Sequence, residues 1–252
     1  MDWAALRRLT AARIGLARSG PALGTGPLLE LRRAHAMARD AVHAELDPAA
    51  LHLNRPALLA CSQAGDRRTY LMRPDLGRTL HPESFARLTE HAGSYDLAIT
   101  LADGLSAAAV SSHAPPLLHA LLPALSEWSL APLVVARHAR VTLGDRVAAA
   151  LGADAALILI GERPGLSAPN SLGAYLTWAP GPGTTDASRN CVSNIRPEGL
   201  PYAEAARKLA FLLARMREIR ATGVLLKDES DTAPIPFSAE PEPAPPALAD
   251  RR

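Results

Sequence analysis

Short apolar runs alternate with Ala-rich amphipathic stretches through the middle of the chain. Residues 97–101, 133–135 and 155–160 have the length and branched composition of strands, and residues 172–178 form a candidate fourth strand. Short apolar runs that end at glycine or proline are typical of strands covered on both faces. Their alternation with helical segments predicts parallel βαβ units with right-handed crossovers.

Helical periodicity also marks the segments outside these strands. Residues 82–91 predict a helix that opens the first unit, and an Ala-rich helix follows residue 106. We expect the pair Pro115 and Pro116 to restart a helix, which then reaches about Trp128, because proline is tolerated best in a first helical turn.

The N-terminal part of the chain is predicted to be helical and then irregular. Residues 4–18 and 28–44 predict two helices, and residues 51–80 show no regular period. The first 40 residues contain seven arginines and three acids. This basic arm is interpreted either as a solvated face or as a surface that docks on a partner. Nucleic acid is a poor third interpretation, because aromatic residues that would stack on bases are almost absent.

The C-terminal part begins with the clearest helix, residues 202–220, whose apolar positions recur on one face. Residues 224–226 are a candidate strand that would close the sheet. Residues 229–252 contain six prolines and five acids, and this composition predicts a disordered tail.

The fold class predicted from these patterns is α/β, a Rossmann-like parallel-sheet domain preceded by an N-terminal helical segment. Its division is a helical and irregular segment over residues 1–80, the sheet domain over 81–228 and the tail over 229–252.

Composition narrows the possible partners. The net charge of the 252 residues is +2, which favours neither nucleic acid nor an anionic membrane as a partner. No apolar run approaches the ~18 residues of a membrane span, and no signal peptide is evident at the N-terminus. Cys61 and Cys191 are far apart and predict neither a disulfide framework nor a zinc site. A cytoplasmic protein is therefore expected.

The carboxyl end of the strand at residues 155–160 is the predicted ligand-binding edge, because open α/β sheets bind ligands there. Glu162 follows this strand directly. It either pairs with Arg163 or Arg189, or accepts hydrogen bonds from amide groups of a ligand. Cys191 is either a small buried apolar residue or a position whose backbone lies against the ligand.

Other motifs carry weaker signals. Asp103 ends a strand and would either cap the next helix or bind a ligand hydroxyl. Residues 104–106 and 165–167 each resemble half of a hydrolase nucleophile elbow, but both lack the second glycine. The histidines show no metal-binding spacing, and neither G-x-G-x-x-G nor the base-off cobalamin motif D-x-H-x-x-G is present. No catalytic residue and no metal site are predicted.

Five stretches in order along the chain resemble the small (light, beta) subunit of ethanolamine ammonia-lyase. The resemblance extends from about Leu6 to Lys227, and its motifs are RPDLGR at 73–78, DGLS at 103–106, GERPGL at 161–166, SLGAY at 171–175 and RNCVSNIRPEG at 189–199.

The resemblance implies an adenosylcobalamin enzyme that converts ethanolamine to acetaldehyde and ammonia. The family's large subunit is a TIM barrel that holds the substrate, and the cofactor lies base-on between it and the Rossmann-like small subunit. The implied assembly is a heterooligomer with six copies of each subunit. The family's cobalamin contacts on this subunit correspond to Val141, Glu162 and Cys191.

Two further expectations concern the localisation and an alternative function. Bacterial microcompartment association is known in the family, but the N-terminal extension linked to it is missing from this sequence. The alternative function is a stand-alone cobalamin- or nucleotide-binding module without a catalytic partner.

Overall fold

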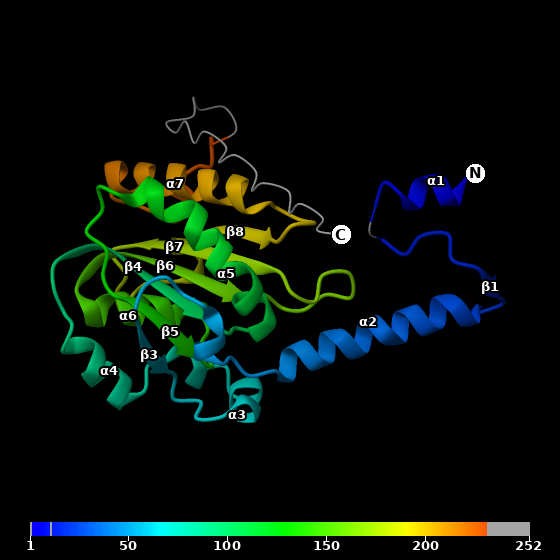
Figure 1. The fold of residues 1–252 in the computed structure, drawn as a ribbon, viewed down its shortest axis with the longest axis horizontal. Coiled ribbons are helices and arrows are strands. Elements are labelled where there is room, and N and C mark those ends of the chain that lie inside the picture. Colours follow the sequence, from blue (N-terminus) through cyan, green and yellow to red (C-terminus); the bar gives the residue numbers. More distant parts are fainter. Residues whose placement is uncertain (1, 11, 231–252) are drawn as a thin grey trace, which may run out of the picture.

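A six-stranded sheet forms the centre of the molecule in the computed structural model, which describes residues 2–10 and 12–230. The sheet order is β3-β5-β4-β6-β7-β8, and β1 and β2 form a separate ribbon (Figure 1). The strands are β1 (Arg18–Ser19), β2 (Ala22–Leu23), β3 (Ala57–Cys61), β4 (Tyr95–Ala102), β5 (Leu133–Arg137), β6 (Ala153–Gly161), β7 (Leu172–Trp178) and β8 (Asn190–Ile195). The α-helices are α1 (Trp3–Arg7), α2 (Thr25–His43), α3 (Arg67–Met72), α4 (Pro82–Thr89), α5 (Ala107–Leu121), α6 (Val141–Leu151) and α7 (Tyr202–Ile219). Short 3-10 helices are η1 (Pro48–Leu51), η2 (Leu76–Arg78), η3 (Leu122–Leu125), η4 (Asp186–Ser188) and η5 (Gly223–Leu225).

The predicted α/β class is confirmed, and the sheet is mixed. Strands β3, β5, β4 and β6 are parallel, whereas β7 runs antiparallel to β6 and β8 antiparallel to β7. Parallel pairing needs a crossover of about a dozen residues or more, usually a helix. No helix lies between Gly161 and Leu172, so the chain reverses there and β7 pairs antiparallel with β6.

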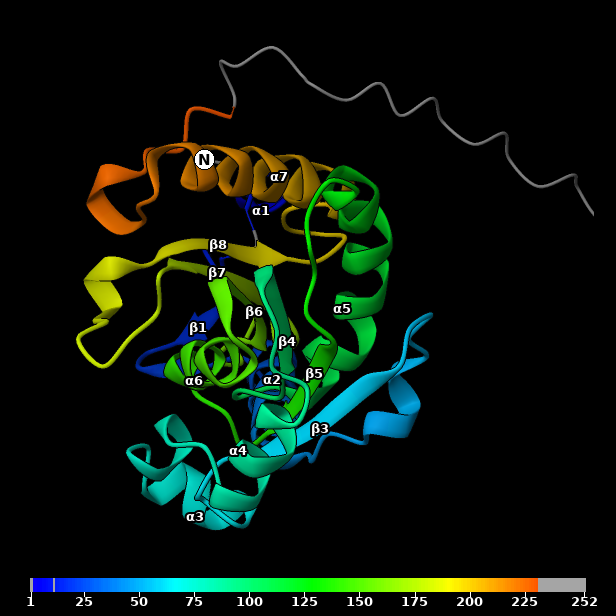
Figure 2. The ribbon, with the colours of Figure 1, turned by 90° about the vertical axis from the view of Figure 1, so that its left-hand side faces the viewer.

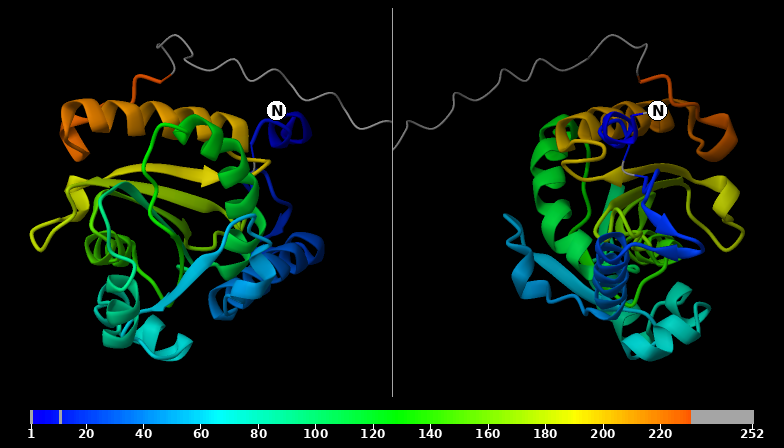
Figure 3. Two further views of the ribbon diagram at one scale, coloured as in Figure 1. Left: turned by 60° about the vertical axis from the view of Figure 1, so that its left-hand side comes forward. Right: turned by 90° about the vertical axis from the view of Figure 1, so that its right-hand side faces the viewer.

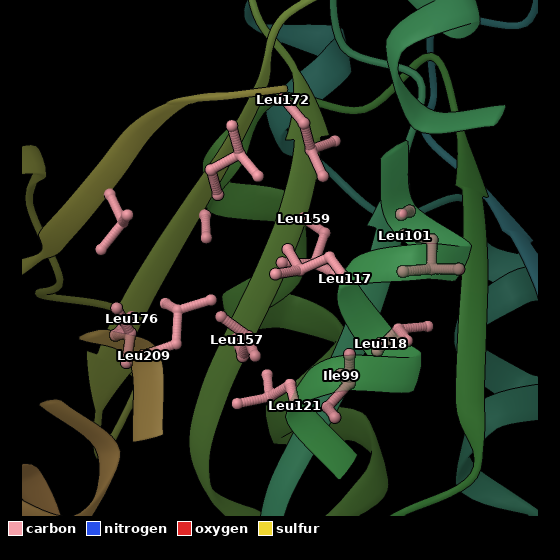
Figure 4. Packing of buried hydrophobic residues seen from close by; sticks show 14 of the residues in the cluster. Ile99, Leu101, Leu117, Leu118, Leu121, Leu157, Leu159, Leu172, Leu176 and Leu209 are labelled. Atoms are coloured by element: carbon pink, nitrogen blue, oxygen red, sulfur yellow. The ribbon is translucent and has the colours of Figure 1, made fainter. Parts of the chain in front are cut away.

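Helices cover both faces of the sheet. Helices α5 and α7 pack on one face, and α4 and α6 pack on the other (Figure 2). In strand β6, Leu157 and Leu159 point to the α5–α7 side (Figure 4), whereas Ala156 and Ile158 point to the α6 side. Residues 155–160 are all buried, which confirms the interpretation of this run as a strand covered on both faces.

Helix α7 confirms the apolar face predicted for residues 202–220. Burial of one leucine side chain on such a face contributes about 1.5–3 kcal/mol, so this face holds the helix on the sheet. The predicted face is buried at Ala205, Ala206, Leu209, Leu213 and Met216 and half-buried at Tyr202.

The helix predicted over residues 4–18 is wrong beyond its first turns, because α1 ends at Arg7. The Arg7 guanidinium donates hydrogen bonds to the carbonyls of Ile14 and Gly15, so the chain must fold back. Gly15 has φ +58° and packs so closely on Trp3 that a Cβ there would lie 2.4 Å from the ring. The turn is therefore one that favours glycine.

The helix predicted over residues 28–44 is confirmed as α2, which begins three residues earlier, at Thr25. None of its residues is fully buried. It projects from the sheet domain with the N-terminal segment beside it (Figures 1 and 3).

The prediction that residues 51–80 are irregular is wrong at the strand β3 and at the helix α3. This strand pairs in parallel with β5 and forms one edge of the main sheet. Its sequence, ALLAC, is apolar but contains no β-branched residue, so its composition did not mark it as a strand, and Leu59 is 51% exposed at this edge of the sheet. The domain boundary predicted at residue 80 stays a prediction. Strand β3 of the main sheet lies on the N-terminal side of that boundary.

The helix break predicted at Pro115 and Pro116 is also wrong, because α5 runs through both prolines. The carbonyls that lose their N–H donors belong to Ser111 and Ser112, which are not buried, so water can hydrogen-bond to them. Eight buried residues of α5 hold the helix against the core despite this loss.

Residues 224–226 do not close the sheet. They enter the 3-10 helix η5, in which Val224 and Leu225 are 85% and 72% exposed. Ser230 is buried and accepts a hydrogen bond from Arg207 at its carbonyl, so the ordered chain extends past the predicted boundary at Asp228. The rest of the predicted tail, residues 231–252, lies outside the described residues.

Crossing a bilayer demands a helix that is both long and highly apolar. Within residues 2–10 and 12–230, none of the helices combines that length with that hydropathy.

Candidate functional site

A pocket of about 400 Å³ opens where strands β4 and β6 end and helix α6 begins. Its position agrees with the expectation that ligands bind at the carboxyl ends of parallel strands. The lining residues are Tyr70, Gly104, Leu105, Arg140, Val141, Ile160, Gly161, Glu162, Arg163 and Tyr175.

Two glycines bring the ends of β4 and β6 together beneath this pocket. A Cβ on Gly161 would lie 2.1 Å from the Ser106 carbonyl oxygen, and one on Gly104 would lie 2.2 Å from the Gly161 oxygen. Gly104 also has φ +52°, and the Leu105 N–H donates to the Gly161 oxygen at 2.9 Å. Only glycine fits this approach, which explains why both motifs contain one.

Val141 is the first residue of helix α6, and its N–H faces no capping side chain. Arg140 occupies the cap position without capping the helix, and it donates its own N–H to the Gly77 oxygen at 2.8 Å. The N–H groups of Val141 and Thr142 have no acceptor in the described part of the chain. The helix therefore presents two free donors and the positive end of its dipole where the pocket begins.

Glu162 reaches from the end of β6 across β7 towards β8. Its side chain lies over Gly173, where a Cβ would be 2.9 Å from Oε1. Oε2 accepts a hydrogen bond from the Asn194 N–H at 3.2 Å, and Oε1 has no donor among the residues described. The carboxylate is thus held at one oxygen and available at the other.

The predicted pairing of Glu162 with Arg189 is wrong. Arg189 binds the carboxylates of Asp145 and Asp186 instead. The Arg189 and Asp145 side chains are 3% and 5% exposed, so this buried pair fixes the start of β8 against helix α6. It thereby sets the position of Cys191, two residues further along the chain.

Cys191 stands on β8 directly opposite Tyr175 on β7. Its neighbour Val192 packs into the α5–α7 core, so Cys191 faces the α6 side. The residue is exposed, and the interpretation as a buried apolar residue is wrong. Partial desolvation by neighbouring atoms still raises the pKa of the exposed Cys191 thiol, and burial raises the pKa of the Tyr175 hydroxyl well above its usual range. Both groups are therefore protonated at neutral pH, and neither is an activated nucleophile.

The structure brings the three predicted site residues to one side of the sheet. Val141 and Glu162 line the same pocket, and Cys191 lies beside Tyr175, which also lines it. Sequence reasoning missed Tyr70 and Arg140, for which it offered no signal. Tyr175 ends a motif that the sequence had already marked.

Asp103 does not cap the helix that follows it. Ser106 does so, because its hydroxyl accepts the Ala109 N–H. The buried Asp103 carboxylate accepts the N–H groups of His138 and Ala139 at 2.8 and 3.0 Å and pairs with Arg67. It therefore joins the ends of β4 and β5 and is not available to a ligand.

Comparison with known proteins adds an independent finding. The family model of the ethanolamine ammonia-lyase light chain matches residues 1–227. A protein of Azotobacter vinelandii named ethanolamine ammonia-lyase small subunit is 54% identical over 242 residues, which span 92% of this chain and 90% of the relative. Proteins with the same name from Xanthomonas campestris pv. campestris and Ralstonia nicotianae are 52% and 50% identical, each over 91% of this chain and over 88% and 89% of their own lengths.

Proposed function

This chain belongs to the ethanolamine ammonia-lyase light chain family, and on that premise we propose that it holds adenosylcobalamin for the enzyme's large subunit. The assembled enzyme would convert ethanolamine to acetaldehyde and ammonia. The observation that carries the proposal is that Val141 and Glu162 line one pocket and Cys191 lies opposite Tyr175, which also lines it. The two cysteines are free thiols, in keeping with a reducing cytoplasm.

The polar groups at this edge fit the rim of a corrin, which is a ring of neutral amides. The free N–H groups of Val141 and Thr142 can donate to amide oxygens. The free Oε1 of Glu162 can accept from an amide N–H, in a charge-assisted bond worth roughly 1.5–3 kcal/mol. The set has both donors and acceptors, as an amide rim requires.

The described residues at the pocket include no poised acid–base pair, so the role proposed for this chain is binding and orientation. When bound, adenosylcobalamin supplies homolysis of its cobalt–carbon bond, from which the radical reaction starts. The Tyr175 hydroxyl and the Cys191 thiol stay protonated and offer only hydrogen bonds. We place the large subunit on the face of β7 and β8 that carries the exposed Cys191, beside the pocket.

The chain alone is expected to release no ammonia from ethanolamine, because no residue here is placed to transform the substrate. Activity should appear after co-expression with the large subunit and addition of adenosylcobalamin. Ammonia release by the single purified chain would refute the proposed role. Cobalamin binding by the single chain, with no complex and no activity gained on co-expression with the large subunit, would instead support the stand-alone module.

Replacing Glu162 by glutamine is expected to weaken cobalamin binding about tenfold or more. The amide keeps an oxygen for the Asn194 N–H but loses the charge, and about 1.4 kcal/mol corresponds to a factor of ten. Turnover at saturating cofactor should change less. The measurement is an absorbance titration of the complex with cobalamin.

Glu218→Gln is the matched control, because Glu218 lies exposed on α7 and pairs with Arg215 of the same helix, away from the pocket. If Glu162→Gln and Glu218→Gln gave the same titration curve, Glu162 would not belong to the site.

A further inference from the structure

Two arginines give the pocket a basic wall, defined here as Arg140 and Arg163. Both line the cavity beside the first turn of α6. In the described chain, neither has a carboxylate partner among the ion pairs. The proposed amide contacts of the corrin rim do not use them.

Arg140 stacks on the ring of Tyr70. Its guanidinium carbon lies 4.5 Å from the centroid of the Tyr70 ring, and Tyr70 is fully buried with its hydroxyl donating to the Ala139 oxygen at 3.0 Å. A Cβ on Gly77 would lie 2.9 Å from that ring and 3.0 Å from Arg140 Cγ. Gly77 belongs to the motif at 73–78, whose bend is closed by a bidentate pair between Arg73 and Asp75. This motif therefore positions the Arg140 side chain against Tyr70.

The seated guanidinium is not neutralised by this chain. Its Nε is out of contact with solvent and has no acceptor among the residues described. Stacking occupies its face and leaves its remaining edge donors free, which is how arginine recognises phosphate. Val141, the first residue of the uncapped helix α6, lines the same pocket, and such helix starts favour anions.

Among the described residues that line this pocket, Glu162 is the one acid, and it does not neutralise both arginines. Glu162 lies over Gly173 and accepts a hydrogen bond from the Asn194 N–H of β8, so one of its two oxygens is already engaged. The lining thus carries two guanidinium groups against one carboxylate. An anionic group of a ligand would neutralise the remaining positive charge of the lining.

We infer that the basic wall binds the phosphodiester of the nucleotide loop of cobalamin. This inference rests on the proposed function. A pocket of about 400 Å³ is too small for a whole corrin, so only one part of the cofactor can enter. The phosphodiester is the anionic group on the periphery of the cofactor, and the wall offers it a bidentate partner in Arg140.

The test compares two ligands on the complex with the large subunit. Cobinamide has the corrin and its amides but lacks the phosphodiester and the nucleotide base. Arg140→Gln should raise the dissociation constant for cobalamin at least tenfold and leave that for cobinamide unchanged, both followed by absorbance titration. Arg163→Gln is the second variant, because this exposed residue can be replaced without risk to folding, and it should give a smaller loss of the same selectivity. Arg215→Gln on α7 is the control and should change neither constant.

The outcomes separate the two proposals. If the unmodified complex bound neither ligand, the proposed function would fail. Suppose instead that the unmodified complex bound cobalamin and cobinamide. If the arginine variants then weakened the binding of the two ligands equally, or changed the binding of neither ligand, only the phosphate assignment would be overturned. Circular dichroism of each variant verifies that its fold is intact.

Discussion

Replacing Arg67 by methionine is expected to lower the free energy of unfolding by about 3–5 kcal/mol, because it leaves a buried carboxylate without its counter-ion. Arg67 and Asp103 have side chains that are 6% and 1% exposed, and their ion pair measures 3.3 Å. The same guanidinium donates to the carbonyls of Val42 at 2.7 Å and Gly104 at 2.8 Å. One side chain thus connects the end of α2 to the end of β4.

The loss should depend on pH in a defined direction. Burial raises the pKa of the Asp103 carboxyl, and the donors from Ala139, His138 and Arg67 oppose that shift. Removing Arg67 removes one opposing donor, so the folded-state pKa rises further above the unfolded value. An acid with a raised folded-state pKa costs stability as the pH rises past its unfolded value. The deficit should therefore be larger at pH 8 than at pH 5.

Urea unfolding of Arg67→Met and Arg68→Met at both pH values measures this effect. Arg68 is the next residue of α3 and is exposed, so its replacement should change stability by no more than about 0.5 kcal/mol. Equal losses in the two variants, or a deficit that grows towards acid, would contradict the assignment.

Replacing Gly161 by alanine is expected to cost about 1–3 kcal/mol of stability and more than tenfold in cobalamin affinity. The new Cβ would meet the carbonyl oxygens of Ser106 at 2.1 Å and Asp103 at 2.6 Å. Both are backbone atoms at the end of β4, so relief requires the two strand ends to separate. Since Glu162 is the next residue, its carboxylate would move with them.

Gly183→Ala is the matched control, because nothing lies within 4 Å of the position that its Cβ would occupy. Thermal unfolding and the absorbance titration should both detect Gly161→Ala and neither should detect Gly183→Ala. A Gly161→Ala protein with unchanged stability would show that the two strand ends tolerate separation.

Much of the fold could be predicted because burial on both sides leaves a direct trace in the sequence. The run at 155–160 is apolar at every position, and it is the strand β6 at the centre of the packing. Edge strand β3 is also a short apolar run, ALLAC at 57–61, but it has no β-branched residue, so its composition did not mark it as a strand. The prolines of α5 misled the prediction because local propensity was outweighed by the burial of the helix on the core.

The candidate site could be predicted only where a motif carried it. Glu162 follows a strand end, and that position in the sequence is enough to predict a ligand contact. Arg140 and Tyr70 are 70 residues apart along the chain and come together through Gly77, a packing relation that no local pattern contains.

By itself, the sequence determined the α/β class, the strands whose apolar runs are rich in branched residues, and the family, because these depend on local composition and on motifs in order. Only the tertiary structure decided the reversal of the sheet after β6 and the partners of Asp103 and Arg189. The tertiary structure also decided that Arg140 stacks on Tyr70. Each of these depends on which distant residues are brought within a few ångströms, and that is fixed by packing of the whole chain.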